Sequence, residues 1–231
     1  LRTAQLQTDD LVRRARRGAT VTAWHHTDPG ILDAQGALSA TAVPILTTTV
    51  FPALEGLMER LDSPSAAFLD VGTGVGRLAI AMCRAFPLVR VVGIDPWAPA
   101  GSLAARNVAD AGLRDRIELR AQAVQDLDDV ARYDAVWVPV VFLSHEAVAR
   151  GLTRIAAALR PGGWVLAVTQ HSAGRDLASS VYRLVTRLSG GTELTTEDVV
   201  GLLEARGYAR VRAWPRFPGI APRLVVGRRP E

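Results

Sequence analysis

The chain has 231 residues, of which 48% are hydrophobic and 22% are charged, a composition typical of a folded globular protein and not of a disordered one. Its net charge is +4 and its isoelectric point is near 10.1. All of its basic residues are arginines. Because arginine keeps its charge at every accessible pH, the high isoelectric point does not by itself indicate a nucleic-acid partner.

Three further features narrow the class of protein. No uninterrupted apolar run approaches the roughly eighteen residues that a membrane-spanning helix needs, so we expect no membrane partner. The polar start of the chain is unlike a signal peptide and favours a cytoplasmic protein; because the first residue is Leu1 and not Met, we expect residues to precede it. Cys83 is the sole cysteine, which excludes a disulfide framework and a cysteine-based metal site, and we expect no metal.

The first 61 residues are predicted to form a helical extension. The pattern indicates a helix over residues 8–17, which Thr8 or Asp9 would cap and Gly18 would end. An irregular stretch is expected over residues 22–36, followed by a second helix over residues 44–61. A turn at residues 62–65 separates this extension from the rest of the chain.

From residue 66 onward, short segments rich in β-branched residues alternate with helical ones. Strands are expected over residues 67–71, 90–94, 117–120, 133–138, 163–170, 211–214 and 223–227. Helices are expected over residues 77–85, 101–111, 127–130, 146–159, 175–188 and 196–206. This alternation predicts the α/β class, with a doubly wound, seven-stranded, mostly parallel sheet and helices on both faces.

A glycine-rich turn follows the first of these strands. It contains Gly72, Gly74 and Gly76 and leads into the helix that begins at Arg77. Glycines allow a tight turn and the close approach of a ligand, which the N–H groups of the following helix would face. A purely structural turn is the alternative. The dinucleotide fingerprint would need its third glycine at the position of Arg77, which disfavours a nicotinamide dehydrogenase.

Asp95 ends the next apolar strand. In a doubly wound sheet, ligands bind beyond the carboxyl ends of the strands, and a carboxylate there can accept both hydroxyls of a ribose. Asp95 could instead cap a helix. Trp97 could stack on an adenine or pack on the surface.

The spacing from Asp70 through the glycines to Asp95 resembles that of the class I S-adenosylmethionine (SAM)-dependent methyltransferase family, whose fold is Rossmann-like. Residues 116–127 look like its third strand and adenine loop, residues 133–137 like its fourth strand, and residues 159–164 like the turn before its fifth. The resemblance covers residues 66–228 in order, and it implies that residues 66–231 form a SAM-binding domain.

The resemblance also implies cofactor-binding roles. Asp70 would orient the amino group of SAM, and Asp95, followed by a turn at Pro96, would hold the ribose hydroxyls. The methionine part would be lined by the glycine loop: Val71, Gly72, Thr73, Gly74 and Gly76. The adenine would be flanked by Trp97, Val124 and Gln125, and the sulfonium by Val138 and Pro139. Many family members carry an aspartate in the adenine loop, where this chain has Ala123, so Gln125 or Asp126 would have to substitute.

Four histidines are candidates for a catalytic base. A base is needed only if the acceptor must lose a proton. His171 follows the fifth predicted strand and His145 the fourth, while His25 and His26 lie in the irregular N-terminal stretch. Each could instead be structural or solvated, and His145 could simply cap the next helix.

The extension allows two interpretations. One is a lid that encloses the acceptor with apolar and polar side chains, namely Trp24, His25, His26, Thr41, Thr47, Thr48 and Phe51. The other is a helical layer without substrate contact. Residues 172–195 are a second candidate cover.

The sequence therefore predicts a SAM-dependent methyltransferase for a small-molecule acceptor, acting on oxygen with nitrogen and carbon open, in specialised metabolism. An RNA or DNA methyltransferase is the first rival. Base-modifying members of the family show an Asn/Asp-Pro-Pro-aromatic motif where this chain has Val138-Pro139-Val140-Val141-Phe142, and basic clusters interleaved with aromatics are missing, so we expect no nucleic-acid partner. A SAM-binding sensor is the second rival, which the intact glycine loop and Asp95 disfavour. The oligomeric state stays open.

Overall fold

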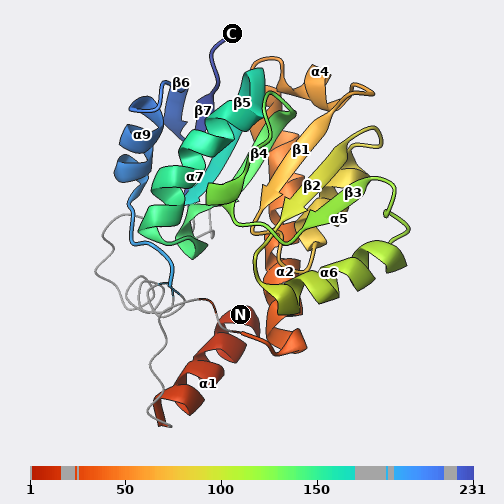
Figure 1. Ribbon diagram of the computed structural model, residues 1–231, viewed down its shortest axis with the longest axis vertical. Helices are drawn as coiled ribbons and strands as arrows, with labels where there is room; N and C mark the ends of the chain where they lie inside the picture. Colours follow the sequence, from red (N-terminus) through yellow and green to blue (C-terminus); the bar gives the residue numbers. More distant parts are fainter. Residues whose placement is uncertain (1, 17–23, 25, 170–185, 187–189, 216–222) are drawn as a thin grey trace.

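A computed structural model describes residues 2–16, 24, 26–169, 186, 190–215 and 223–231. Its strands form one sheet in the order β3-β2-β1-β4-β5-β7-β6 (Figure 1). Neighbouring strands among β1 to β5 are parallel, whereas β7 is antiparallel to both β5 and β6. The strands are β1 Ala67–Val71, β2 Arg90–Ile94, β3 Ile117–Arg120, β4 Tyr133–Pro139, β5 Leu159–Thr169, β6 Ala209–Ala213 and β7 Arg223–Arg228. The predicted Rossmann-like, mostly parallel seven-stranded sheet is confirmed.

Helices cover both faces of the sheet. In the extension they are α1 Arg2–Arg16, α2 Pro29–Ala40, α3 Ala42–Ile45, the π-helical η1 Leu46–Val50, the 3-10 helix η2 Phe51–Ala53 and α4 Leu57–Leu61. In the rest of the chain they are α5 Arg77–Ala85, α6 Ala98–Asp110, η3 Val124–Asp126, η4 Val140–Phe142, α7 His145–Ala158 and α9 Thr196–Glu204.

Two apolar clusters hold these layers to the sheet. On one face, the extension and α5 pack through residues such as Val50, Leu61 and Met82. On the other face, α7 and α9 pack through residues such as Leu152 and Leu203. The parallel strands are therefore buried on both sides, which explains why they read as continuous apolar segments in the sequence.

The predictions for the extension need three corrections. The predicted helix over residues 8–17 begins earlier, since α1 starts at Arg2 and Thr8 lies inside it. The stretch predicted to be irregular contains α2, because the Asp28 side chain accepts hydrogen bonds from the backbone N–H groups of Gly30 and Ile31, at 2.7 and 3.2 Å, and Pro29 fits the first helical turn. The helix predicted over residues 44–61 is interrupted, since Leu54 is extended and Gly56 is left-handed with φ of 71°.

Residues 127–130 form no helix, contrary to prediction. The preceding residues form η3, and the Asp129 carboxylate accepts hydrogen bonds from Arg120, Arg132 and Tyr133, at 2.8 to 2.9 Å. These contacts to neighbouring strands hold the segment as a loop. Of the helix predicted over residues 175–188, only residue 186 lies within the described residues.

The helical run from Pro29 to Ala53 has 25 residues and a mean hydropathy of 1.3 in its most apolar window. Within the described residues it is the one helix long and apolar enough to cross a membrane by length and composition alone. In this structure its buried side chains, including Leu46 and Val50, join the cluster that covers the sheet.

Candidate cofactor site

The glycine loop lies between the carboxyl ends of β1 and β2. The backbone N–H groups of Gly72 and Thr73 donate to the Ile94 carbonyl, at 2.8 and 3.1 Å, which ties the loop to the end of β2. Gly72 and Gly74 have φ of 66° and 56°, a region that favours glycine. A Cβ added at Gly72 would lie 3.6 Å from the Pro139 ring, and one at Gly74 would lie 3.9 Å from the Gly72 carbonyl oxygen. The glycines therefore leave the backbone of the loop free of side chains, so that a ligand can approach it closely.

The far side of the loop is fixed by α6. A Cβ added at Gly76 would lie 3.5 Å from that of Ala104, so the loop and the helix are in close contact there. The Asn107 side chain donates a hydrogen bond of 2.9 Å to the Val75 carbonyl. Sequence reasoning missed Asn107, because nothing in the local pattern links it to a loop 32 residues away.

Asp95 lies at the tip of β2 and faces the loop. Its two carboxylate oxygens accept hydrogen bonds from the backbone N–H groups of Gly74 and Trp97, both at 2.8 Å. Burial raises the pKa of Asp95, and the two N–H groups lower it. A carboxylate oxygen has capacity for more than one hydrogen bond, so each can still accept a ribose hydroxyl. The helix-cap alternative is not supported, because Trp97 occupies the N-cap of α6.

Asp70 lies beneath the loop and is only 2% exposed. Its carboxylate accepts a hydrogen bond of 2.7 Å from the Thr73 hydroxyl. Burial raises the pKa of Asp70 to about 7; the Thr73 hydroxyl opposes this shift, and the Asp95 carboxylate adds to it. The loop is thus bracketed by two carboxylates, which suits a ligand that carries an ammonium group and a ribose.

The extension packs directly on this loop. In α2, Gly36 lies so close to Val75 and Arg77 that an added Cβ would clash with both side chains. The Asp33 carboxylate accepts hydrogen bonds from Nε and Nη2 of Arg77, at 3.0 and 2.6 Å. A small apolar cluster joins the extension, the glycine loop and the region of α6. Its members are Trp24, Leu32, Val75, Trp97, Ala100 and Leu103.

An aromatic cluster extends from Trp97 toward the end of β4. The Trp97 indole donates a hydrogen bond of 2.8 Å to the His26 carbonyl. The Trp24 ring makes edge contacts with His26, at 4.9 Å between ring centroids, and with Phe142, at 5.5 Å. His26 is 4% exposed, and its Nδ1 lies 3.3 Å from the Asp10 carboxylate. Figure 1 shows α1, which carries Asp10, at the end of the molecule toward which the parallel strands point.

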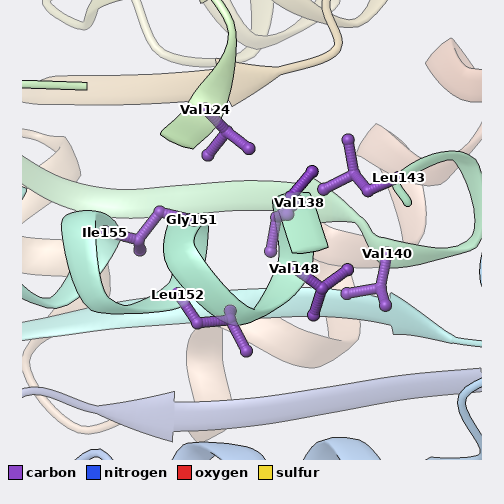
Figure 2. Close-up of a pocket in the computed structure, with 9 residues that line it drawn as sticks. Val124, Val138, Val140, Leu143, Val148, Gly151, Leu152 and Ile155 are labelled. Atoms are coloured by element: carbon purple, nitrogen blue, oxygen red, sulfur yellow. The ribbon is translucent and has the colours of Figure 1, made fainter. Parts of the chain in front are cut away.

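Val124 and Val138, two of the residues predicted to bind the cofactor, direct their side chains toward α7. Figure 2 shows the side chains of Val124 and Val138 directed into an apolar pocket against α7, together with residues such as Gly151 and Leu152. The space between these side chains does not admit a water molecule. Val124 could therefore contact a cofactor through its backbone only, while its side chain packs 2.8 Å from the Cβ position of Gly151.

The other residues predicted for cofactor binding or catalysis do not form one group in the described part of the chain. Gln125 and Asp126 follow Val124 in η3, and Pro96 is exposed beside Asp95. His145 is exposed at the first position of α7, where Ser144 and not His145 supplies the helix cap. His25 and His171 lie outside the described residues, as does most of the predicted cover over residues 172–195. Within the described part of the chain, no group of three or more His, Cys, Asp or Glu residues could hold a metal ion.

Thr41, Thr47, Thr48 and Phe51 do not gather with Trp24 and His26. Phe51 is fully buried in the cluster between the extension and the sheet. The three threonine hydroxyls donate to backbone carbonyls three or four residues earlier in their own helical run. Of the residues named for a lid, Trp24 and His26 therefore lie near the glycine loop, whereas Phe51 and the three threonines belong to the helices over the sheet; the lid itself stays a prediction.

Comparisons with known proteins agree with this geometry. A family model described as a methyltransferase domain matches residues 68–163. Release factor glutamine methyltransferases of Cereibacter sphaeroides and Xylella fastidiosa are each 30% identical to the chain, over 78% of its length and over 66% and 70% of theirs. The mitomycin biosynthesis 6-O-methyltransferase of Streptomyces lavendulae is 29% identical, over 66% of this chain and 44% of that protein.

Among solved structures, that of the SAM-dependent methyltransferase SibL in its apo form is similar, with a TM-score of 0.69 over 97% of this chain and 70% of that one. At 21% identity, this likeness concerns the fold alone. The chain belongs to the class I SAM-dependent methyltransferases, whose cofactor is SAM. It spans 66% of the Cereibacter relative and less than half of the mitomycin enzyme.

Proposed function

We propose that this chain transfers the methyl group of SAM to an oxygen atom of a small-molecule acceptor. SAM, when bound, supplies a methyl group that its sulfonium charge already activates. The protein therefore contributes mainly proximity, alignment and exclusion of water. In this proposal the backbone of Gly72 and Gly74 lines the methionine part, Asp70 binds the ammonium group and Asp95 holds the ribose hydroxyls.

The observation that carries the choice of a small acceptor is the cover over the site. Trp24 contacts Phe142 beyond the end of β4, and Leu32 and Trp97 pack in one cluster with Val75 of the glycine loop. Apolar and aromatic side chains with few polar groups among them are typical of the lining of small-molecule sites. The similarity to the mitomycin 6-O-methyltransferase supports oxygen as the acceptor atom and a role in specialised metabolism.

Two of the arginines serve contacts within the domain and not a nucleic-acid partner. Arg116 donates to the carbonyls of Cys83, Phe86 and Val89, and Arg206 donates to those of Leu202 and Ala149. Arginines used in this way tie helix ends and loops together inside the domain. Contacts with phosphates would instead need exposed guanidinium groups clustered on one face.

His26 is the candidate base that lies in the aromatic cover. Its imidazole Nδ1 lies 3.3 Å from the Asp10 carboxylate, and a carboxylate partner orients an imidazole. His26 would accept the acceptor's proton if the reaction requires its removal. His25 and His171 stay candidates by sequence position.

Methylation of a protein glutamine is the second candidate function. The release factor glutamine methyltransferases of two organisms are 30% identical to this chain, which favours a shared cofactor site and leaves the acceptor open. An acceptor of that kind would need access through the cover formed by Trp24 and α2.

Transfer of labelled methyl groups from SAM tests the proposal. The protein is incubated with a panel of hydroxylated aromatic small molecules, with release factor and with RNA. We expect label in a small molecule, and we expect Asp95→Asn to reduce the transfer at least tenfold, because the ribose loses a charged hydrogen-bond acceptor worth about 1.5–3 kcal/mol. Asp110→Asn, at the exposed end of α6, is the matched control and should leave transfer unchanged. Label confined to release factor or RNA would contradict the proposal.

A further inference from the structure

The glycine loop is flanked by the carboxylates of Asp70 and Asp95. The Asp70 carboxylate accepts from the Thr73 hydroxyl, and the Asp95 carboxylate accepts from the backbone N–H groups of Gly74 and Trp97. In the part of the chain that the structure describes, no arginine or histidine forms an ion pair with either one. Asp70 is also almost completely buried, at 2% exposure. An ionised carboxylate in such a place is costly unless a positive charge accompanies it.

The described elements packed against Asp70 place no free positive charge beside it. On β2, its neighbour in register is Gly93, and the nearest titratable group is Asp95. On β4, its neighbour in register is Trp137, which is not titratable. Above it, α5 begins with Arg77, whose guanidinium group is bound to the Asp33 carboxylate of α2.

The hydrogen bonds to the Asp70 carboxylate offset only part of the cost of burying its charge. The Thr73 hydroxyl and the backbone N–H of Ala79 at the start of α5 favour the ionised carboxylate, whereas burial and the Asp95 carboxylate oppose it. Burial is the largest of these effects and raises the pKa of Asp70 to about 7. A cation beside Asp70 would complete this compensation, and SAM carries an ammonium group.

We propose that Asp70 holds a proton in the ligand-free protein and releases it when the ammonium group of the cofactor binds. The carboxyl O–H bond breaks, the proton passes to solvent, and the carboxylate accepts hydrogen bonds from the ammonium group. When the cofactor binds, its ammonium group therefore replaces the proton on Asp70. The affinity of the protein for the cofactor then depends on pH. This inference rests on the proposed function, because it requires that the site bind SAM or its product.

Calorimetric titration with S-adenosylhomocysteine measures the exchange directly. Titrations in buffers of different ionisation enthalpy give the number of protons released. With a pKa of about 7 for Asp70, we expect release of about 0.9 proton at pH 6 and about 0.1 at pH 8, and an affinity about tenfold higher at pH 8.

Two variants assign the proton to Asp70. Asp70→Asn keeps the shape of the side chain and should abolish both the release and the pH dependence of affinity. Thr73→Val keeps the shape of Thr73 and removes the hydroxyl that stabilises the carboxylate, so the release should move to higher pH. Asp110→Asn, the exposed control on α6, should behave as the wild type.

Unfolding of the ligand-free protein supplies a second readout. The pKa of Asp70 is higher in the folded protein than the 3.8 of an unperturbed carboxyl. Its stabilising contribution is therefore complete below that value and is lost as pH rises through about 7. We expect the melting temperature of Asp70→Asn, relative to wild type, to rise between pH 5.5 and pH 8.

The outcomes separate this inference from the proposed function. Binding of S-adenosylhomocysteine without proton release, or equal release by Asp70→Asn, would overturn the inference and leave the cofactor site intact. Failure of the folded wild type to bind would contradict the proposed function. In that case a melting-temperature difference that does not change with pH would overturn the inference as well.

Discussion

Gly93 on β2 has no space for a side chain, because Thr73 lies over it. A Cβ at this position would lie 2.7 to 2.9 Å from three atoms of the Thr73 side chain. Thr73 is the residue that donates to Asp70, so its placement on a glycine sets the geometry beneath the loop.

Gly93→Ala should therefore displace Thr73. We expect a loss of about 1–3 kcal/mol in the free energy of unfolding, the usual cost of overpacking a buried site, and weaker binding of S-adenosylhomocysteine. Urea unfolding measures the first effect. Gly201→Ala in α9 is the control, since a Cβ there meets nothing within 4 Å and should be neutral or stabilising by about 0.5–1 kcal/mol. Equal stability of Gly93→Ala and wild type would show that Thr73 does not depend on this glycine.

The site residues that were predictable are those whose roles are local. Asp70 lies near the end of β1 with Gly72 and Gly74 directly after that strand, and Asp95 follows β2. Their spacing along the chain is therefore enough to place them at one edge of a parallel sheet. Gly93 was not predictable, because its role is a contact with a side chain twenty residues earlier, and periodicity carries no information about such contacts.

At the scale of elements, α2 is the part of the extension that shapes the site. Gly36 faces Val75 and Arg77 at the start of α5, and the two helices approach closely there. Gly36→Ala should push α2 away from the glycine loop, and we expect a cost of about 1–3 kcal/mol. Faster hydrogen exchange in the amides of α2, with unchanged exchange in α7, would locate the effect.

Gly101→Ala in α6 is the matched control for this variant. A Cβ there meets nothing within 4 Å, so the exchange of α2 should stay as in the wild type. Unchanged exchange of α2 in Gly36→Ala would contradict close docking of α2 on the glycine loop.

The accuracy of the predicted elements follows from what stabilises each one. The bounds of β1, β2, β3 and α5 agree with prediction residue for residue, because β-branched runs bounded by turns and a 3.6-residue apolar period mark them clearly. In the extension, Pro52 and Gly56 interrupt an apolar period that by itself indicates one long helix. Residues 127–130 show a similar apolar spacing, but ion pairs of Asp129 with Arg120 and Arg132 hold them as a loop.

For the whole molecule, the extension and the sheet share one core and one site. The same cluster contains Leu46 of the extension, Leu78 of α5 and Trp164 of β5. Three parts of the chain that are distant in sequence meet here: the glycine loop, the tip of β2, and Trp24 with α2. We propose that SAM binds at this junction.

Calorimetric titration of S-adenosylhomocysteine into wild type, Asp95→Asn and Asp110→Asn tests that claim most directly. We predict micromolar binding by the wild type and by Asp110→Asn. Asp95→Asn should bind more weakly by about 1.5–3 kcal/mol, because a charged hydrogen-bond acceptor is lost. Unfolding curves would first establish that all three proteins are folded. A folded wild type that binds no S-adenosylhomocysteine, or an Asp95→Asn variant that binds as tightly as the wild type, would contradict the account.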